Sequence, residues 1–341
     1  MKKINWGIVG LGNIAQNFSD GFLEVDNANL LAISSHNPIK LEKFQKKNNI
    51  DNKFVFNQYE KLLQCEEIDV VYITLPHSFH HEWIIKSLEY NKRVVVEKPA
   101  TINLDEALNV KKKVIDKKIF FVEGFMYRYH PQTIKIVDII KKKIIGNLIS
   151  MTSDFGKNLI TKKKFFIFNK KKKIKENNRL FNKSLGGGCI LDLGCYPASF
   201  SILLASLDKN LNYNNFALSN VKKENGETDV EIHSEASIIF DGKMTSTIKA
   251  SFKNDIGSKS IIKGTKGSLF IDNTWHGGRM NMILGDKEYD ITQIENRNIF
   301  SYEIENISKS ILDGYDKPSF PGMNLEDTVL NMRILENWKN A

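Results

Sequence analysis

The sequence has only three cysteines and no long apolar run. Three scattered cysteines in 341 residues are too few for a disulfide framework, which indicates a reducing, cytoplasmic setting. No apolar run approaches the ~20 residues that cross a bilayer, so we expect no membrane partner. The apolar stretch after Met1 is interrupted by Gly7, Gly10 and Gly12, and it predicts a strand entering a turn rather than a signal peptide.

The excess of positive charge is concentrated in one segment. The chain carries a net charge of +9, and residues 157–183 contain eleven Lys or Arg against one acid, Glu176. Because the remainder is close to neutral, we interpret the segment as a solvated lysine-rich loop and expect no nucleic-acid partner. The alternative is an anion- or nucleic-acid-binding arm in which Phe165, Phe166 and Phe168 stack on bases.

A chain of this length exceeds the usual size of one hydrophobic core, so we expect two domains. In the first part, short apolar runs alternate with longer amphipathic ones, which is typical of a parallel sheet with crossover helices. The strands predicted there are 4–9, 30–34, 70–75, 93–97 and 119–123, and the helices are 14–25, 38–47, 79–90 and 104–117.

After about Phe125 the pattern changes to consecutive strands without helices between them, which favours an antiparallel sheet. Strands are predicted at 148–155, 235–240, 245–252, 260–263 and 268–271, and helices at 132–143, 190–207, 302–312 and 324–338. The predicted fold class is therefore α/β. An N-terminal Rossmann domain with a doubly wound parallel sheet spans 1–125, and a C-terminal α+β domain with a large, mostly antiparallel sheet spans 126–341.

A glycine-rich turn follows the first predicted strand and opens the first predicted helix. Gly10 permits the tight turn, Gly12 lets the backbone approach a pyrophosphate, and the small Ala15 lets the helix pack near the strand. The backbone N–H groups at the helix start, around Asn13 and Ile14, together with the helix dipole favour an anion. This arrangement predicts a nicotinamide dinucleotide cofactor.

The end of the second predicted strand favours NADP over NAD. An NAD site usually has Asp or Glu there to bind the ribose 2′-hydroxyl. Residues 34–40 contain no carboxylate, whereas Ser35, His36 and Lys40 suit a 2′-phosphate. NADP is the predicted cofactor, and NAD is the alternative.

Three further segments and one turn converge on a family resemblance. They are Glu97-Lys98-Pro99, residues 123–132 (EGFMYRYHPQ), residues 186–197 (GGGCILDLGCYP) and the turn 264–268 (GTKGS). With the glycine turn, they resemble the glucose–fructose oxidoreductase / inositol dehydrogenase (Gfo/Idh/MocA) family. Within it they are most similar to the branch of dimeric dihydrodiol dehydrogenases and NADP-dependent D-xylose dehydrogenases. The tract near 161–175 departs from the family pattern.

The predicted catalytic residues are Tyr196, Lys98 and Asp192. Oxidising a carbinol needs a base for the hydroxyl proton while hydride leaves to the nicotinamide. Asp192 and Tyr196 are four residues apart on a predicted helix and share a face. A lysine ammonium favours a tyrosine phenolate, so Tyr196 is the predicted acid/base, Lys98 its electrostatic partner and substrate ligand, and Asp192 an orienting residue. The roles of Lys98 and Tyr196 can be exchanged.

The loop after the third predicted strand carries Thr74, Pro76, His77 and His80. By the family resemblance it borders the nicotinamide ribose, and these residues are predicted to contact the cofactor. The alternative for His80 and His81 is a metal pair, but adjacent helical residues diverge and no Cys-rich partner motif is present. No metal is predicted.

Glu97 and Arg128 are predicted to line the same cleft, with a structural ion pair as the alternative. Trp275 is assigned either to a sugar pocket or to core packing. The predicted substrate is a small-molecule sugar or polyol, and a homodimer or higher homo-oligomer is expected through the C-terminal sheet. The alternative function is a non-catalytic NADP-binding sensor or scaffold.

Overall fold

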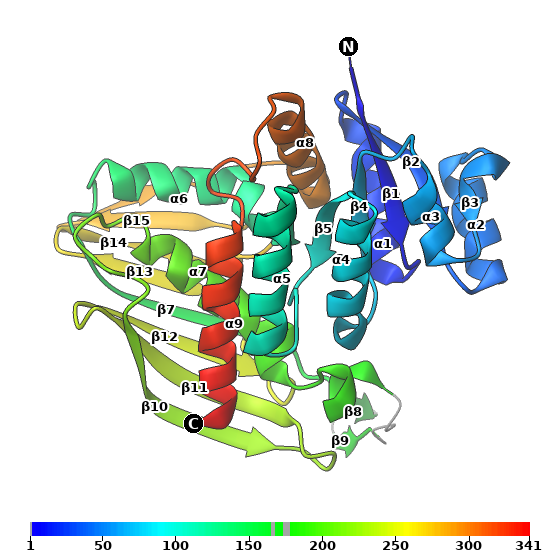
Figure 1. Cartoon of the computed structure of the whole chain (residues 1–341). Helices are drawn as coiled ribbons and strands as arrows, with labels where there is room; N and C mark the ends of the chain where they lie inside the picture. Colours follow the sequence, from blue (N-terminus) through cyan, green and yellow to red (C-terminus); the bar gives the residue numbers. More distant parts are fainter. Residues whose placement is uncertain (1, 165–167, 173–177) are drawn as a thin grey trace. The chain divides into compact units, whose positions relative to one another are not determined.

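The computed structural model describes residues 2–164, 168–172 and 178–341. The chain forms two compact units, of which the first contains 1–130 and 296–329 and the second 131–295 and 330–341 (Figure 1). The sequence predicted a single boundary between 125 and 126. The contacts instead assign residues 296–329 to the first unit, and no local sequence pattern indicates that they belong there.

Six parallel strands form the sheet of the first unit in the order β3-β2-β1-β4-β5-β6. This is the strand order of a doubly wound dinucleotide-binding fold, so the predicted class of this domain is confirmed. The strands are β1 (Ile4–Val9), β2 (Ala28–Ser34), β3 (Val55–Phe56), β4 (Val70–Ile73), β5 (Arg93–Glu97) and β6 (Phe121–Gly124). The two-residue strand β3 was not predicted, because so short a strand has no readable period.

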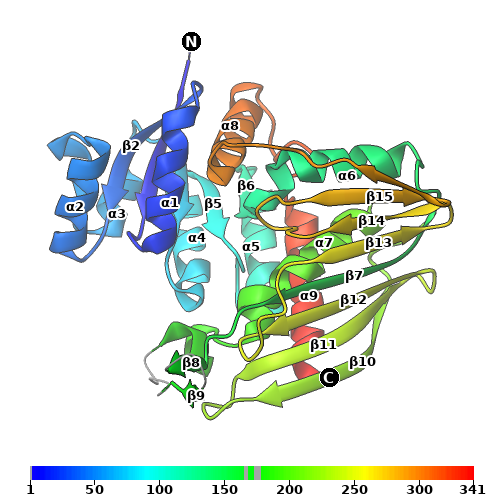
Figure 2. The same ribbon diagram turned by 180° about the vertical axis from the view of Figure 1, so that it is seen from behind.

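Helices cover both faces of this sheet, as Figures 1 and 2 show for α4 and α5 on one face and α1 on the other. The helices between strands are α1 (Asn13–Gly21), α2 (Pro38–Asn48), α3 (Tyr59–Gln64), α4 (His80–Glu89) and α5 (Leu104–Lys117). All four residues of the central strand β4 are buried. A strand covered on both faces reads as a continuous apolar run, which is why it was recognisable.

Helix α8 (Ile299–Leu312) packs on α1 and on β1 and β2 within the first unit. The two helices approach so closely that a Cβ on Gly21 would lie 3.0 Å from both the Ile304 side chain and the backbone of Ser301. The indole of Trp6 donates a hydrogen bond of 3.0 Å to the hydroxyl of Ser308. These contacts explain why a segment near residue 300 belongs to the N-terminal unit.

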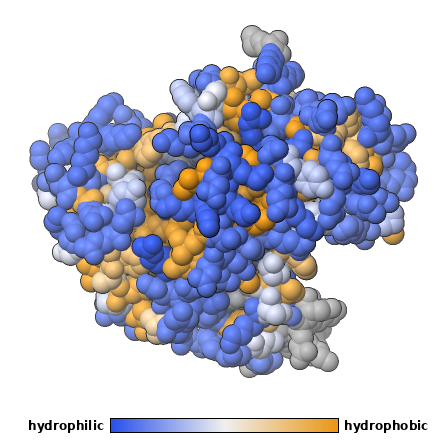
Figure 3. Space-filling model, in the orientation of Figure 1, coloured by the Kyte–Doolittle hydropathy of each residue, from blue (hydrophilic) through white to orange (hydrophobic). Residues whose placement is uncertain are grey.

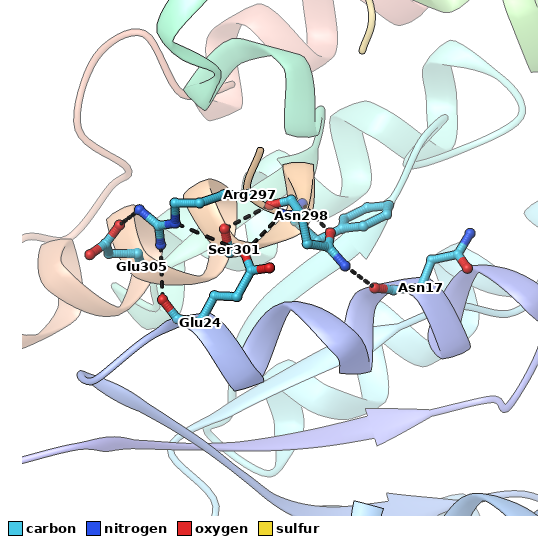
Figure 4. A network of polar contacts seen from close by, with 7 residues as sticks. Asn17, Glu24, Arg297, Asn298, Ser301 and Glu305 are labelled. Atoms are coloured by element: carbon cyan, nitrogen blue, oxygen red, sulfur yellow. Dashed lines mark hydrogen bonds and ion pairs between the residues drawn. The ribbon is translucent and has the colours of Figure 1, made fainter. Parts of the chain in front are cut away.

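A polar network at the start of α8 adds to this attachment (Figure 4). The guanidinium of Arg297 forms an ion pair of 2.9 Å with Glu305 and donates to the backbone carbonyl of Glu24 at 3.1 Å. Asn298 donates from its backbone to the Glu24 carboxylate at 2.8 Å and from its side chain to the carbonyl of Asn17 at 3.1 Å. Two of these four acceptors are backbone carbonyls, which any residue carries, so the residue types alone could not reveal the contact.

Eight strands form the sheet of the second unit in the order β10-β11-β12-β7-β13-β14-β15-β16. All pairs are antiparallel except β12 with β7, which confirms the mostly antiparallel prediction. The strands are β7 (Leu148–Gly156), β10 (Phe216–Asn225), β11 (Glu231–Phe240), β12 (Met244–Ser251), β13 (Ser260–Gly264), β14 (Gly267–Ile271), β15 (Met280–Leu284) and β16 (Lys287–Asp290).

Helices cover one face of this sheet. Helix α7 (Cys195–Ala205) and most of α9 (Leu325–Asn340) lie in front of it in Figure 1 and behind it in Figure 2, and α6 (Pro131–Lys141) runs along one end. On β12, Met244 and Ile248 are buried toward the helices while Thr245 and Thr247 stay half-buried. The alternation of period two therefore separates a packed face from an open one.

Figure 3 shows that hydrophilic side chains cover most of the surface on the helical side, with apolar residues between them. The helical stretch 183–205 is long and apolar enough to cross a membrane. This corrects the expectation that no run approaches that length. Because 94% of its most apolar part is buried inside the protein, the stretch belongs to the core.

The lysine-rich segment contains a short antiparallel pair, β8 (Thr161–Lys164) with β9 (Phe168–Lys171). The lysine-rich composition predicted a loop there, because such a segment has no apolar alternation that would indicate a strand. Phe165 and Phe166, which figured in the alternative nucleic-acid interpretation, lie outside the described residues.

Candidate active site

The register of the first sheet aligns four strand ends in one row. Val9 pairs with Ser34 on one side and with Ile73 on the other, and Ile73 pairs with Val96. Each of these residues lies at or next to the carboxyl end of its strand. The loops that carry the predicted cofactor residues therefore leave the sheet side by side, at the edge where doubly wound folds bind ligands.

The glycine turn after β1 requires glycine at its first position. Gly10 has a φ of +92°, and a Cβ there would lie 2.8 Å from the Leu75 side chain. The hydroxyl of Thr74 donates to the carbonyl of Gly10 at 2.7 Å. Thr74, predicted as a cofactor contact, thus holds the turn against the loop after β4.

The start of α1 is open. Gly12 is its N-cap, with no side-chain cap, and a Cβ on Gly12 would meet no atom within 4 Å. Asn13 is exposed and Ile14 half-buried in the first turn. A helix N-terminus offers unsatisfied N–H groups, and here the space in front of them is clear. These residues fit the pyrophosphate of a dinucleotide.

The start of α2 differs because a side chain already caps it. Asn37 accepts the backbone N–H of Lys40 at 3.0 Å, and the buried Ser35 hydroxyl accepts the N–H of Asn37 at 3.2 Å. His36 and Lys40 are exposed. The predicted phosphate-binding residues are therefore presented by a rigid turn, and none of the residues from Ser34 to Lys40 is acidic.

Two aromatic residues that the sequence analysis missed adjoin this turn. The His36 imidazole lies 4.2 Å from the ring of Tyr59 between centroids, and Tyr59 packs edge-on against Trp83 at 4.8 Å. Nδ1 of His36 lies 3.0 Å from the carbonyl of Asn57. Burial raises the pKa of the Tyr59 phenol. Neither aromatic lies in a motif, so no signal in the sequence pointed to them.

His80 connects two loops. Its ring is fully buried, with Nδ1 2.8 Å from the carbonyl of Pro99 and Nε2 2.7 Å from the carbonyl of Leu75. Because both partners are acceptors, both contacts are hydrogen bonds only when both ring nitrogens carry a proton. His80 thus joins the loop after β4, with half-buried Pro76 and buried His77, to the turn that carries Lys98.

Lys98 is half-buried directly after β5. The preceding Glu97 is buried, and its carboxylate accepts a hydrogen bond from the hydroxyl of Tyr72 on β4. Glu123, on β6, accepts the N–H of Ala100 at 2.9 Å. Burial raises the pKa of Glu123 to about 7, although this hydrogen bond and the charges of Arg128 and Lys98 oppose the shift. The sequence pointed to Glu123 as part of the segment 123–132, but it did not predict that the carboxyl group is buried.

Arg128 is fully buried and ion-paired. It contacts Asp327 at 2.9 Å and donates to the carbonyl of Pro321 at 3.2 Å. Its burial and these two contacts agree with the structural ion pair weighed as the alternative. Across the described residues no cluster of three or more potential metal ligands occurs.

In the second unit, the predicted helix over 190–207 consists of two parts. Residues 190–194 form a π-helical turn, and α7 then runs to Ala205. The α-helical spacing invoked for Asp192 and Tyr196 therefore does not apply to the first turn, because a π-turn holds more residues. Both residues are buried, and Asp192 lies 3.4 Å from Arg179, a contact that the sequence did not indicate.

Tyr196 lies in an aromatic cluster. Its ring centroid is 5.1 Å from that of Phe155 on β7, edge to face, and 5.4 Å from that of Trp275. Trp275 is completely buried. The first unit thus gathers the predicted cofactor residues and Lys98 at one sheet edge, and the second unit sets Tyr196 among aromatic rings.

Comparison with known proteins places these arrangements in a family. Residues 4–125 match the model of the oxidoreductase family with an NAD-binding Rossmann fold, and residues 133–270 match the GFO/IDH/MocA C-terminal domain. The chain is 23% identical to a trans-1,2-dihydrobenzene-1,2-diol dehydrogenase of Xenopus tropicalis, over 97% of this chain and 96% of the relative. It is 29% identical to an NADP(+) D-xylose 1-dehydrogenase of Hypocrea jecorina, over 58% of this chain and 52% of the relative.

Solved structures share the fold. An aldose-aldose oxidoreductase of Caulobacter crescentus, complexed with glycerol, superposes with a TM-score of 0.85 at 20% identity, covering 100% of this chain and 97% of that one. A 3-ketoreductase of Actinomadura kijaniata, complexed with NADP and TDP-benzene, gives 0.82 at 19% identity, covering 99% and 98%. With both family domains matched in order along the sequence, this chain belongs to the Gfo/Idh/MocA family of NAD(P)-dependent oxidoreductases.

Proposed function

We propose that this protein catalyses reversible, NADP-dependent hydride transfer at a carbinol or lactol carbon of a sugar or cyclic diol. The observation that carries the proposal is the row of aligned strand ends, with an open glycine turn at β1 and Lys98 at β5. The names of the relatives, a dihydrodiol dehydrogenase and a D-xylose dehydrogenase, support the substrate class.

The cofactor contacts follow from the loops. We assign the pyrophosphate to Gly10, Gly12, Asn13 and Ile14, where the helix start is open. The 2′-phosphate belongs to the exposed turn after β2, and its residues are Ser35, His36 and Lys40. The nicotinamide half belongs to the loops after β4 and β5, with Thr74, Pro76, His77, Glu97 and Lys98, while His80 and Arg128 hold the surrounding backbone.

The bound nicotinamide supplies the hydride acceptor at its C4. In the oxidative direction, the phenolate of Tyr196 takes the proton of the substrate hydroxyl as the hydride leaves the carbinol carbon, which becomes a carbonyl. The ammonium of Lys98 stabilises the phenolate and binds the substrate oxygen, since a nearby cation favours an anionic partner. Asp192, paired with Arg179, orients the substrate or Lys98.

The test is a substrate panel of D-xylose, other aldoses and trans-dihydrodiols, assayed with NADP and with NAD by absorbance of the reduced cofactor. We expect turnover with NADP for at least one sugar or diol. Tyr196→Phe should lower kcat by a factor of about 10² to 10⁴ without changing the Kd for NADP. Tyr315→Phe is the control, because Tyr315 is exposed on the surface.

The outcomes separate this proposal from its alternative. NADP binding without turnover of any panel member would support the alternative function, a non-catalytic NADP-binding sensor or scaffold. If Lys98 rather than Tyr196 carries the proton, Tyr196→Phe retains a base, and only the Lys98→Met variant loses the fall of kcat at low pH that protonation of the base causes. Absence of binding to either cofactor would overturn both functions.

We further propose that the open face of the second sheet joins two copies of the chain. One row across it runs through Ser237, Thr247, Thr152, Ile261 and Phe270, which are paired neighbours in register. These side chains carry no charge. The next row on the same face carries Glu235, Lys249 and Asp154, and Lys249 is ion-paired with Glu235 at 3.2 Å.

Analytical ultracentrifugation tests this association. Thr152→Arg, which places a charge in the middle of the row, should yield a monomer, whereas Asn337→Arg on the exposed side of α9 should not. A wild-type monomer at micromolar concentration would overturn the proposal. The three cysteines are all free thiols, which supports the further proposal of a cytoplasmic location.

A further inference from the structure

The loop between β14 and β15, residues 273–278, is held by a glutamine from another element. Gln132, in the first turn of α6 and 1% exposed, donates from Nε2 to the carbonyls of Asn273 at 3.1 Å and Thr274 at 3.4 Å. Its Oε1 accepts the N–H of Gly278 at 3.0 Å. One amide side chain therefore ties both ends of the loop together.

A row of buried hydroxyl groups holds the same loop from the sheet side. Ser153 on β7 lies 2.8 Å from Ser260 on β13 between hydroxyl oxygens, and Ser260 lies 2.7 Å from Thr274. The backbone N–H of Thr274 donates to the carbonyl of Ser258 at 2.8 Å. Three consecutive hydroxyls in the interior are costly unless each is satisfied, and here each satisfies the next.

The held loop carries Trp275 into contact with Tyr196. The indole is completely buried, so it offers no face on which a sugar could stack. Its ring lies 5.4 Å from Tyr196 and 5.8 Å from Phe155, and Phe155 in turn lies 5.1 Å from Tyr196. The three rings therefore pack on one another. Of the two assignments that the sequence left open for Trp275, the structure supports core packing, against Tyr196.

We propose that Trp275 and Gln132 are positioning residues for the phenol of Tyr196, an inference that rests on the proposed function. The indole packs against the phenol of Tyr196. Gln132 and the row of hydroxyl groups hold the loop that carries the indole. Reaction rates depend on placing the reacting groups within a fraction of an ångström, and a displacement of about 1 Å costs as much as 10²-fold. Such a role affects kcat and its pH dependence rather than cofactor binding.

Gln132→Met tests the role of the amide, because methionine keeps the length of the side chain and removes all three hydrogen bonds. We expect kcat to fall about tenfold with the Kd for NADP unchanged, and the midpoint of the kcat–pH profile to move. Gln293→Met is the matched control, since Gln293 belongs to the same unit and, among the described residues, donates to the neighbouring carbonyl of Ile291. The control should leave all three quantities unchanged.

Trp275→Leu and Trp275→Phe test the ring itself. Leucine should lower kcat at least as much as Gln132→Met, and phenylalanine, which restores an aromatic ring, should recover part of the loss. The near-ultraviolet circular dichroism of the coupled rings should weaken in Trp275→Leu and in Gln132→Met, and it should persist in Gln293→Met. This spectrum reports the packing of the cluster without any substrate.

Tyr196→Phe separates a failure of the positioning role from a failure of the proposed function. If that variant abolishes turnover while Gln132→Met and Trp275→Leu leave kcat and the pH profile intact, the positioning role is wrong and the proposed function stands. If Tyr196→Phe retains full turnover, the assignment of Tyr196 falls and the positioning role falls with it. Loss of kcat in Gln132→Met with a shifted pH profile, and partial recovery in Trp275→Phe, supports the proposal.

Discussion

The glycine turn after β1 and the turn after β5 (residues 98–100, called the lysine turn) leave the same edge of one sheet. Different parts of the chain determine their conformations. The glycine turn takes its shape mainly from adjacent residues, through the positive φ of Gly10 and the open start of α1, and Thr74 adds one hydrogen bond from the loop after β4. The lysine turn is shaped from outside, by His80 of α4 on Pro99 and by Glu123 of β6 on Ala100. A turn shaped mainly by its own residues can be predicted from the sequence, whereas a turn shaped by distant residues depends on the tertiary fold.

The largest expected effect separates the two turns by function. Lys98→Met should lower kcat by a factor of about 10² to 10⁴ and leave the Kd for NADP within a factor of about three, because the lysine acts on the reacting oxygen. Gly12→Val should do the reverse, since its side chain fills the space that the pyrophosphate needs. Steady-state kinetics and fluorescence titration measure the two quantities.

A Gly12→Val variant that binds NADP as tightly as the wild type would show that the pyrophosphate lies elsewhere. The unfolding free energy of that variant serves as its control. It should fall by no more than about 1 kcal/mol, the cost of valine in place of glycine at an N-cap, because a Cβ at this position meets no atom within 4 Å.

The second expected effect is a pH dependence of stability at the lysine turn. Burial raises the pKa of Glu123 from its ordinary value of 4.5 to about 7. Between these values the folded protein keeps a proton that the unfolded chain releases. The stability linked to this proton is complete below pH 4.5 and is lost as the pH rises to about 7, by about 3 kcal/mol at most.

Denaturant unfolding of the wild type and of Glu123→Gln at pH 5 and pH 8 measures this loss. The amide cannot ionise, so the variant should lose less stability over the interval than the wild type. Parallel curves for the two proteins would show that the carboxyl group of Glu123 titrates at its ordinary value.

The third prediction compares two glycines of one turn. Gly10→Ala should destabilise the protein by about 2 kcal/mol, because its φ of +92° is unfavourable for alanine and its Cβ would lie 2.8 Å from Leu75. Gly12→Ala should cost far less stability. Thermal unfolding of both variants checks the difference, and equal losses would contradict the distinction between a strained position and an open one.

The smallest expected effect concerns the choice of cofactor. His36→Asp supplies the carboxylate that binds a ribose 2′-hydroxyl and repels a 2′-phosphate. The ratio of kcat/KM for NADP to that for NAD should fall about tenfold, or about 1.4 kcal/mol. Lys43→Gln, which also lowers the charge by one and lies on the exposed side of α2, is the control. An unchanged ratio in His36→Asp would place the 2′-phosphate away from this turn.

Local patterns predicted much of the fold because they recur along the chain. The strand 93–97 and the helix 104–117 match β5 and α5 without a change of boundary, since apolar runs and helical periods are properties of consecutive residues. The strands β3, β10, β15 and β16 were missed, and the first turn of the helix over 190–207 is π-helical. These depend on pairing or packing with distant segments.

For this protein, the sequence by itself determined the glycine turn, the two classes of sheet and the family, because each depends on residues that stand near one another in the chain. Only the tertiary structure decided that Arg128 pairs with Asp327, that His80 spans two loops, and that Trp275 stands against Tyr196. Burial and hydrogen bonding across long separations set those roles, and they depend on which distant groups the fold brings within 3 to 6 Å.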